Sequence, residues 1–174
     1  MFNSDHKRVI FQAIPGVIFC LVFTIIAYRF FPFKLQSLFS ILDRLVFTIR
    51  CEFFSALMLF LGICTVGNIR FFTDAIDGSR NNKKVEIHLR YLQNTLDQFI
   101  LLFTGHLILC SYLTEHQMKL IPILVMLFII GRITFWIGYL KTPTARAFGF
   151  GTTSYPTVAV FVYDLYHLIS SVLK

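Results

Sequence analysis

Hydrophobic and polar positions divide the chain into five long apolar runs joined by short polar segments. The runs cover about residues 9–31, 45–69, 85–113, 120–139 and 148–173. A helix that crosses a bilayer needs roughly 20 apolar residues, whereas barrel strands would show alternating segments of about ten. Because backbone polar groups must be paired inside lipid, the pattern predicts an all-α integral membrane protein with five spans.

Composition supports this interpretation and excludes other classes. Of the 174 residues, 56% are hydrophobic and only 14% are charged, whereas about a quarter of a soluble domain is charged. An ordinary soluble enzyme, a disordered chain and a coiled coil are therefore excluded. The first run is too long for a signal-peptide core and lacks a cleavage pattern after it, so we expect a retained anchor. We expect residues 1–44 to form a tail, this anchor and a loop, and residues 45–174 to form a four-helix transmembrane domain.

The basic residues indicate an orientation. The net charge is +7, and with no soluble basic face available, nucleic-acid binding is excluded. Eight basic residues lie on the side of the N-terminus and five on the other, which predicts a cytoplasmic N-terminus. The eight are Lys7, Arg8, Arg70, Arg80, Lys83, Lys84, Lys141 and Arg146, and the five are Arg29, Lys34, Arg44, Lys119 and Lys174. We expect a multi-pass protein of the endoplasmic reticulum, Golgi or lysosome.

Polar residues at the start of the third run are the first candidates for function. Arg90, Asn94 and Asp97 are spaced by four and three residues, which places them on one helix face. Ionisable groups inside spans are costly and indicate functional sites. A cation, an amide and a carboxylate in one column are suited to a small polar zwitterion at the membrane edge.

A second column closes the fourth run, where Arg132 and Tyr139 are followed by Arg146. The predicted topology puts this end, the start of the third run and Arg70 at one depth. Two other interpretations stay open. The arginines could extend to lipid headgroups, and Asn94 and Asp97 could bond between helices.

At these residues the chain resembles the MAPEG family, the membrane-associated proteins of eicosanoid and glutathione metabolism. The resemblance rests on two motifs. In the first, within residues 90–98, an arginine is followed after four residues by an asparagine and after three more by an acid. The second runs from Gly131-Arg132 through Gly138-Tyr139 to Arg146. It covers about residues 45–173. With one helix before the family's four-helix core, the chain looks most like the mattrin branch.

The resemblance implies a homotrimer that binds glutathione between neighbouring subunits, in the cytoplasmic half of the membrane. Arg146 falls where the family has the arginine that stabilises the glutathione thiolate. Phe135 stands where some active members have a tyrosine, Gln93 where one branch has an arginine, and Asp97 in place of the usual glutamate. The implied glutathione-binding residues are Arg70, Arg90, Asn94, Asp97, Arg132 and Tyr139.

The resulting prediction is a glutathione-dependent membrane enzyme of the transferase, peroxidase or reductase type that acts on a lipid-soluble electrophile. An arginine beside the sulfur would favour the reactive thiolate. The alternative keeps the fold without the chemistry, as a membrane scaffold that binds lipid or regulates a protein. A channel or transporter is disfavoured, because the polar residues lie near one face rather than at the midplane.

The remaining polar residues predict structural roles. Arg50 and Glu52 interrupt the second run early, and we expect them at the membrane interface. His106, Asp164 and His167 are expected to face the bundle interior and bond to a neighbouring helix. The four cysteines form no CxxC pair and lie in or beside apolar runs, so neither a disulfide framework nor a metal site is indicated. They are Cys20, Cys51, Cys64 and Cys110.

Overall fold

The computed structural model describes residues 4–30, 38, 40–78, 83–142 and 145–173, without the side chains of residues 4–13, 75, 77 and 84. This part of the chain is almost entirely helical and contains no strand, which confirms the predicted all-α fold. Its helices are α1 (Ser4–Phe30), α2 (Ile41–Phe71), η1 (Asp74–Asp77), α3 (Lys83–Tyr112), η2 (Glu115–Lys119), α4 (Leu120–Lys141) and α5 (Ala147–Val172), η1 and η2 being short 3-10 helices.

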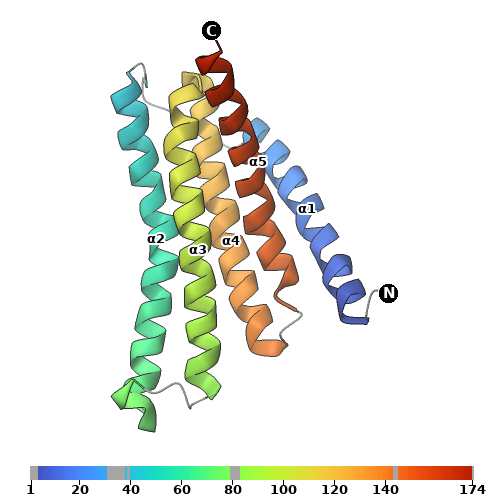
Figure 1. Cartoon of the computed structure of the whole chain (residues 1–174), viewed down its shortest axis with the longest axis vertical. Helices are drawn as coiled ribbons and strands as arrows, with labels where there is room; N and C mark the ends of the chain where they lie inside the picture. Colours follow the sequence, from blue (N-terminus) through green and yellow to red (C-terminus); the bar gives the residue numbers. More distant parts are fainter. Residues whose placement is uncertain (1–3, 31–37, 39, 79–82, 143–144, 174) are drawn as a thin grey trace.

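The helices α2 to α5 run side by side along the long axis of the molecule, and α1 lies next to α5 (Figure 1). α2 packs against α3 and α4, while α1 packs against α5 and α4. The lower end of the view collects the end of α2, the start of α3, the end of α4 and the start of α5. The two predicted polar columns therefore lie in the same half of the bundle, as the topology requires.

α2 begins four residues earlier than the apolar run because Ser40 caps it. The Ser40 hydroxyl accepts a hydrogen bond from the Leu42 backbone N–H at 3.2 Å, and Asp43 accepts one from the Ser40 backbone N–H at 3.2 Å. This reciprocal pair is a capping box, which satisfies two N–H groups that a helix start leaves open.

Glycines bring α4 and α5 unusually close together. A Cβ atom at Gly131 would lie 2.5 Å from Thr153 Cγ2, and one at Gly138 would lie 2.5 Å from the Ala145 carbonyl oxygen. Small residues allow this approach between membrane helices, where dispersion contacts replace the hydrophobic effect as the main attraction. Side chains on α4 can consequently bond directly to α5.

Length and composition support several membrane spans. Among the described residues, Ile41–Phe71, Val85–Tyr112 and Glu115–Lys141 are long and apolar enough to cross a membrane, and the apolar part of α1, Ile14–Phe30, is shorter. α5 is long but carries buried polar residues, including Asp164. Its predicted span rests on its place in the bundle. Much of the charge bias lies outside the described side chains, so the orientation stays a prediction. The residues concerned are Lys7, Arg8, Lys34, Arg80, Lys84 and Lys174.

Candidate functional site: an arginine cluster

Arg132 is the centre of the predicted site, and it is completely buried. Its guanidinium donates to Asn94 Oδ1 of α3 at 2.8 Å and to the hydroxyl of Thr153 on α5, with the Gly149 carbonyl oxygen 3.5 Å away. One side chain therefore links three helices. A buried cation needs such bonds because leaving water is costly.

The surroundings of Arg132 follow from the glycine contacts. Gly149 leaves its carbonyl oxygen accessible to α4, since a Cβ atom there would lie 2.5 Å from the Gly131 carbonyl oxygen. The guanidinium carbon also lies 4.6 Å from the centre of the Phe135 ring, one turn further along α4. The negative face of that ring is attractive to a cation.

Two further arginines lie against the next turn of α4. The Arg146 guanidinium lies 4.7 Å from the Tyr139 ring centre and 5.8 Å from that of Phe135. Arg90 interacts with the Tyr139 side chain and forms an ion pair with Glu86. We call Arg90, Arg132 and Arg146, together with Phe135 and Tyr139, the arginine cluster. It unites residues from α3, α4 and the junction with α5, as the sequence predicted.

The column on α3 divides between the inside and the outside of the bundle. Asn94 is half-buried and faces Arg132, whereas Arg90 and Asp97 are exposed. Gln93 donates a hydrogen bond to Asp97 at 2.9 Å. Along this outer side of α3 runs an open cavity of about 600 Å³, lined by Glu86, Leu89, Arg90, Leu92, Gln93 and Leu96.

Arg70 lies at the same end but apart from the cluster. Its guanidinium lies 3.5 Å from the Gly78 carbonyl oxygen in the segment after α2. Within the described part of the chain, no hydrogen bond or ion pair joins Arg70 to the other predicted site residues. The structure therefore does not make Arg70 part of the cluster.

Electrostatics make the cluster suitable for an anion. Glu86 is the one carboxylate that pairs with a cluster arginine among the described residues, and it serves exposed Arg90. In the part of the chain that the structure describes, Arg132 is stabilised by dipoles and ring faces and has no carboxylate partner, and Arg146 is held against rings. Arginine guanidinium groups bind carboxylates in a bidentate manner, so an anionic ligand could supply the missing charge.

Sequence reasoning missed two partners of Arg132, Thr153 and Gly149. The available signal was the Gly149-Phe150-Gly151-Thr152-Thr153 segment, which is rich in small residues of the kind that mark close helix contacts. As a phosphate-loop motif, its two glycines are only a weak signal. The hydroxyl and carbonyl groups that hold Arg132 come from the same feature that allows α5 to approach.

A second polar cluster lies in the upper half of the bundle, and it corrects the placement of Glu52. Instead of lying at the membrane interface, Glu52 is 2% exposed and pairs with His106 Nδ1 of α3. Asp164 of α5 is also buried and interacts electrostatically with His106. We call Glu52, His106 and Asp164 the Glu52 cluster. His167 lies apart, among the rings of Tyr112, Tyr163 and Tyr166.

Comparison with known proteins gives one family and two relatives. The model of the MAPEG family matches residues 50–166. Transmembrane protein 79 of Mus musculus is 32% identical over 169 residues, which cover 95% of this chain and 43% of the relative. Transmembrane protein 79 of Bos taurus is 32% identical over 143 residues, which cover 82% and 36%. The chain thus spans less than half the length of these relatives. No solved structure matches it.

Proposed function

Because the chain belongs to the MAPEG family, we propose that it is a glutathione-dependent membrane enzyme of the transferase, peroxidase or reductase type. The observation that carries the proposal is the contact of both Arg90 and Arg146 with Tyr139, directly beside buried Arg132. Glutathione carries two carboxylates and a thiol. A group of arginines with few carboxylate partners can bind the two carboxylates and activate the thiol.

Each residue has a distinct role in this proposal. Arg146 is nearest to ring faces rather than to a carboxylate, so its charge is available to a thiolate. Arg90 is exposed and can reach a glutathione carboxylate. Arg132 is enclosed by its own partners and acts by fixing Asn94. Asp97 would hold the amino end of the tripeptide after exchanging its bond with Gln93.

The reaction would begin with loss of the thiol proton. A free thiol is only a few per cent thiolate at neutral pH, and a nearby guanidinium in a low-dielectric site favours the anion. The sulfur then forms a bond to the electrophilic atom of a lipid-soluble substrate. The displaced electron pair moves to the leaving group or conjugated system, which takes up a proton.

The cavity on α3 favours a site shared between subunits. It is lined by residues of a single helix and lies open to the outside, so one protomer supplies only one wall. A homotrimer would close it with a neighbouring subunit through a head-to-tail interface that forms a ring. We propose that this oligomer lies in the endomembrane system with its N-terminus in the cytoplasm.

The direct test is calorimetric titration of the purified protein with glutathione, together with a conjugation assay on a lipid-soluble electrophile. We expect millimolar or tighter binding, and a loss of about 100-fold in turnover for Arg146→Ala, as for other groups that stabilise developing charge. Arg50→Ala is the matched control, since Arg50 is exposed on α2 and should leave turnover unchanged. Absence of binding at millimolar glutathione would refute the proposal.

A non-catalytic scaffold is the second candidate, and Phe135 favours it. The ring beneath Arg132 and Arg146 carries no hydroxyl, so it offers no hydrogen bond to a sulfur atom. The conjugation assay separates the two functions. A scaffold predicts an intact oligomer that turns over no electrophile, and Phe135→Tyr would then be the substitution to test for gain of activity.

A further inference from the structure

A groove on the α1 side of the bundle has no role in the proposed function. It encloses about 610 Å³ between α1, α5 and the ends of α3 and α4 that lie in the upper half. That volume falls within the range of about 300–1,000 Å³ typical of small-molecule sites. Its walls are almost entirely apolar, and several lining residues, such as Leu21 and Ala159, are exposed to the outside of the bundle.

A proline in α5 forms part of the groove wall. Pro156 lines it and has no backbone N–H, so the Thr152 carbonyl lacks its normal helical partner. Cys20 of α1 reaches this carbonyl with its Sγ atom at 3.5 Å. Below the groove, a Cβ atom at Gly16 would lie 3.0 Å from the Phe148 carbonyl oxygen. The two helices thus touch at Gly16 and Cys20.

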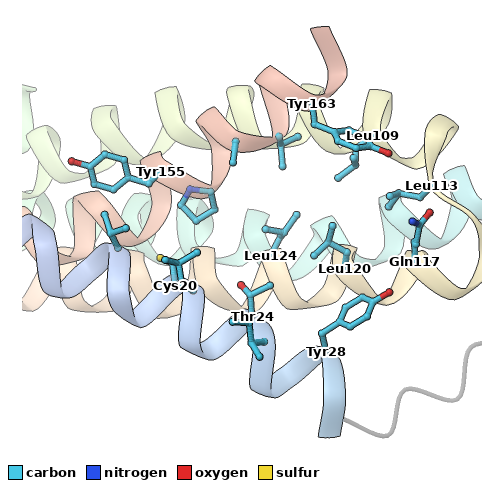
Figure 2. A pocket seen from close by; sticks show the side chains of 16 residues that line it. Cys20, Thr24, Tyr28, Leu109, Leu113, Gln117, Leu120, Leu124, Tyr155 and Tyr163 are labelled. Carbon is cyan, nitrogen blue, oxygen red and sulfur yellow. The ribbon is translucent and has the colours of Figure 1, made fainter. Parts of the chain in front are cut away.

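The two ends of the groove differ in the charge that lies beside them. Figure 2 shows Tyr28 and Gln117 at one end, while Cys20 and Tyr155 lie toward the other. Next to the polar end, Lys119 Nζ lies 3.8 Å from the Tyr28 ring centre and donates to the Tyr28 carbonyl oxygen at 2.9 Å. Arg29, the residue after Tyr28, is exposed. The occupant should therefore be amphipathic, with its polar part at Lys119.

Charge selects among amphipathic occupants. Lys119 bonds to a carbonyl oxygen and a ring face, and no ion pair with a carboxylate is present for it or for Arg29 among the described residues. Glu115 on the same 3-10 helix accepts instead from the Leu38 backbone N–H at 3.2 Å. Two cations without carboxylate partners favour an anionic group over an uncharged sterol hydroxyl.

The length of the groove fits one acyl chain. From Val17 to Tyr28 its α1 wall rises about 17 Å at 1.5 Å per residue, close to half of the roughly 30 Å hydrocarbon core. The polar end coincides with the helix ends and the apolar end with the middle of the bundle. We infer that the groove binds an anionic phospholipid, with one acyl chain between α1 and α5 and its phosphate at Lys119 and Arg29.

Native mass spectrometry can test this inference on the full chain purified from micelles that contain equal amounts of phosphatidylglycerol and phosphatidylcholine. We expect selective retention of phosphatidylglycerol, reduced about fivefold by Lys119→Gln, the loss expected for one cation near a membrane surface. Lys141→Gln, which removes an exposed lysine at the lower end of α4, should have no effect. Equal retention of the two lipids, or preferential retention of added cholesterol, would overturn the inference.

A second pair of variants tests the location. Ala159→Trp fills the groove from its exposed rim, whereas Ile137→Trp adds the same ring to an exposed position on α4 outside it. Only the first should abolish phosphatidylglycerol retention, with the helical circular dichroism of both unchanged. If Ala159→Trp instead reduced the number of subunits in the oligomer and left lipid retention intact, the groove would be a contact between copies and the inference would be wrong.

Discussion

The arginine cluster and the Glu52 cluster lie in opposite halves of one bundle and solve the burial of charge in different ways. Glu52 and His106 pair with each other, and each is about 2% exposed or less. Among the described residues Arg132 has no carboxylate partner, and it is held by an amide, a hydroxyl, a carbonyl and a ring. The Glu52 cluster thus pairs its carboxylate with a residue of its own, whereas the arginine cluster leaves positive charge available to a ligand.

This difference suggests a structural role for the Glu52 cluster and a binding role for the arginine cluster. Glu52 Oε2, His106 Nε2 and both Asp164 carboxylate oxygens have no hydrogen-bond partner among the described residues, yet all three residues are sealed from the outside. The arginine cluster continues outward through Arg90, which is exposed. We therefore expect mutations in the Glu52 cluster to change stability first, and those at the rim of the arginine cluster to change binding first.

The largest effect is expected for Glu52→Leu, because it leaves His106 buried without its partner. Breaking a buried pair costs about 3–5 kcal/mol, whereas replacing both members with apolar residues is often neutral. The double variant Glu52→Leu/His106→Leu should recover most of the lost stability, as measured by unfolding in one detergent. If the two losses simply added, the pair would not be an energetic unit.

Gly149→Ala should cost nearly as much, about 3 kcal/mol, because overpacking forces backbone to move. The added Cβ atom would lie 2.5 Å from the Gly131 carbonyl oxygen and displace α5 from Arg132. Gly67→Ala is the control: nothing lies within 4 Å of that position on α2, so better helix propensity should stabilise slightly. Equal melting temperatures of the two variants would argue against close α4–α5 packing.

These two sites show what could be predicted from the sequence. Apolar runs predicted the five helices, and the spacing of Arg90, Asn94 and Asp97 predicted a polar column that the structure places in the same half of the bundle as Arg132. The inward position of Glu52 could not be deduced, because interior and interface positions alternate within a single helical turn. Which residue faces His106 depends on the rotation of α2, and that is decided by packing against α3 and α4.

Thr153→Val tests how Arg132 is held, with an expected loss of about 1.5 kcal/mol for a hydrogen bond to a charged group. The side chain keeps its shape and loses only the hydroxyl that accepts from Arg132. Thr65→Val is matched to it, since the Thr65 hydroxyl donates to the Leu61 carbonyl of its own helix and should matter little. Comparable losses in both variants would mean that the Arg132 contact contributes nothing specific.

The smallest change in stability is expected for Asp97→Asn. An exposed Gln–Asp pair at this spacing stabilises a helix by about 0.2–0.5 kcal/mol, and the amide oxygen of the new side chain could still accept from Gln93. The same substitution removes the negative charge proposed to hold the amino group of glutathione, so titration should show weaker binding while the unfolding curve stays in place. Weaker binding with unchanged stability is expected if Asp97 faces outward and contacts the ligand rather than the rest of the protein. If stability fell as well, Asp97 would belong with Glu52 as a structural carboxylate, and the contrast between the two halves would fail.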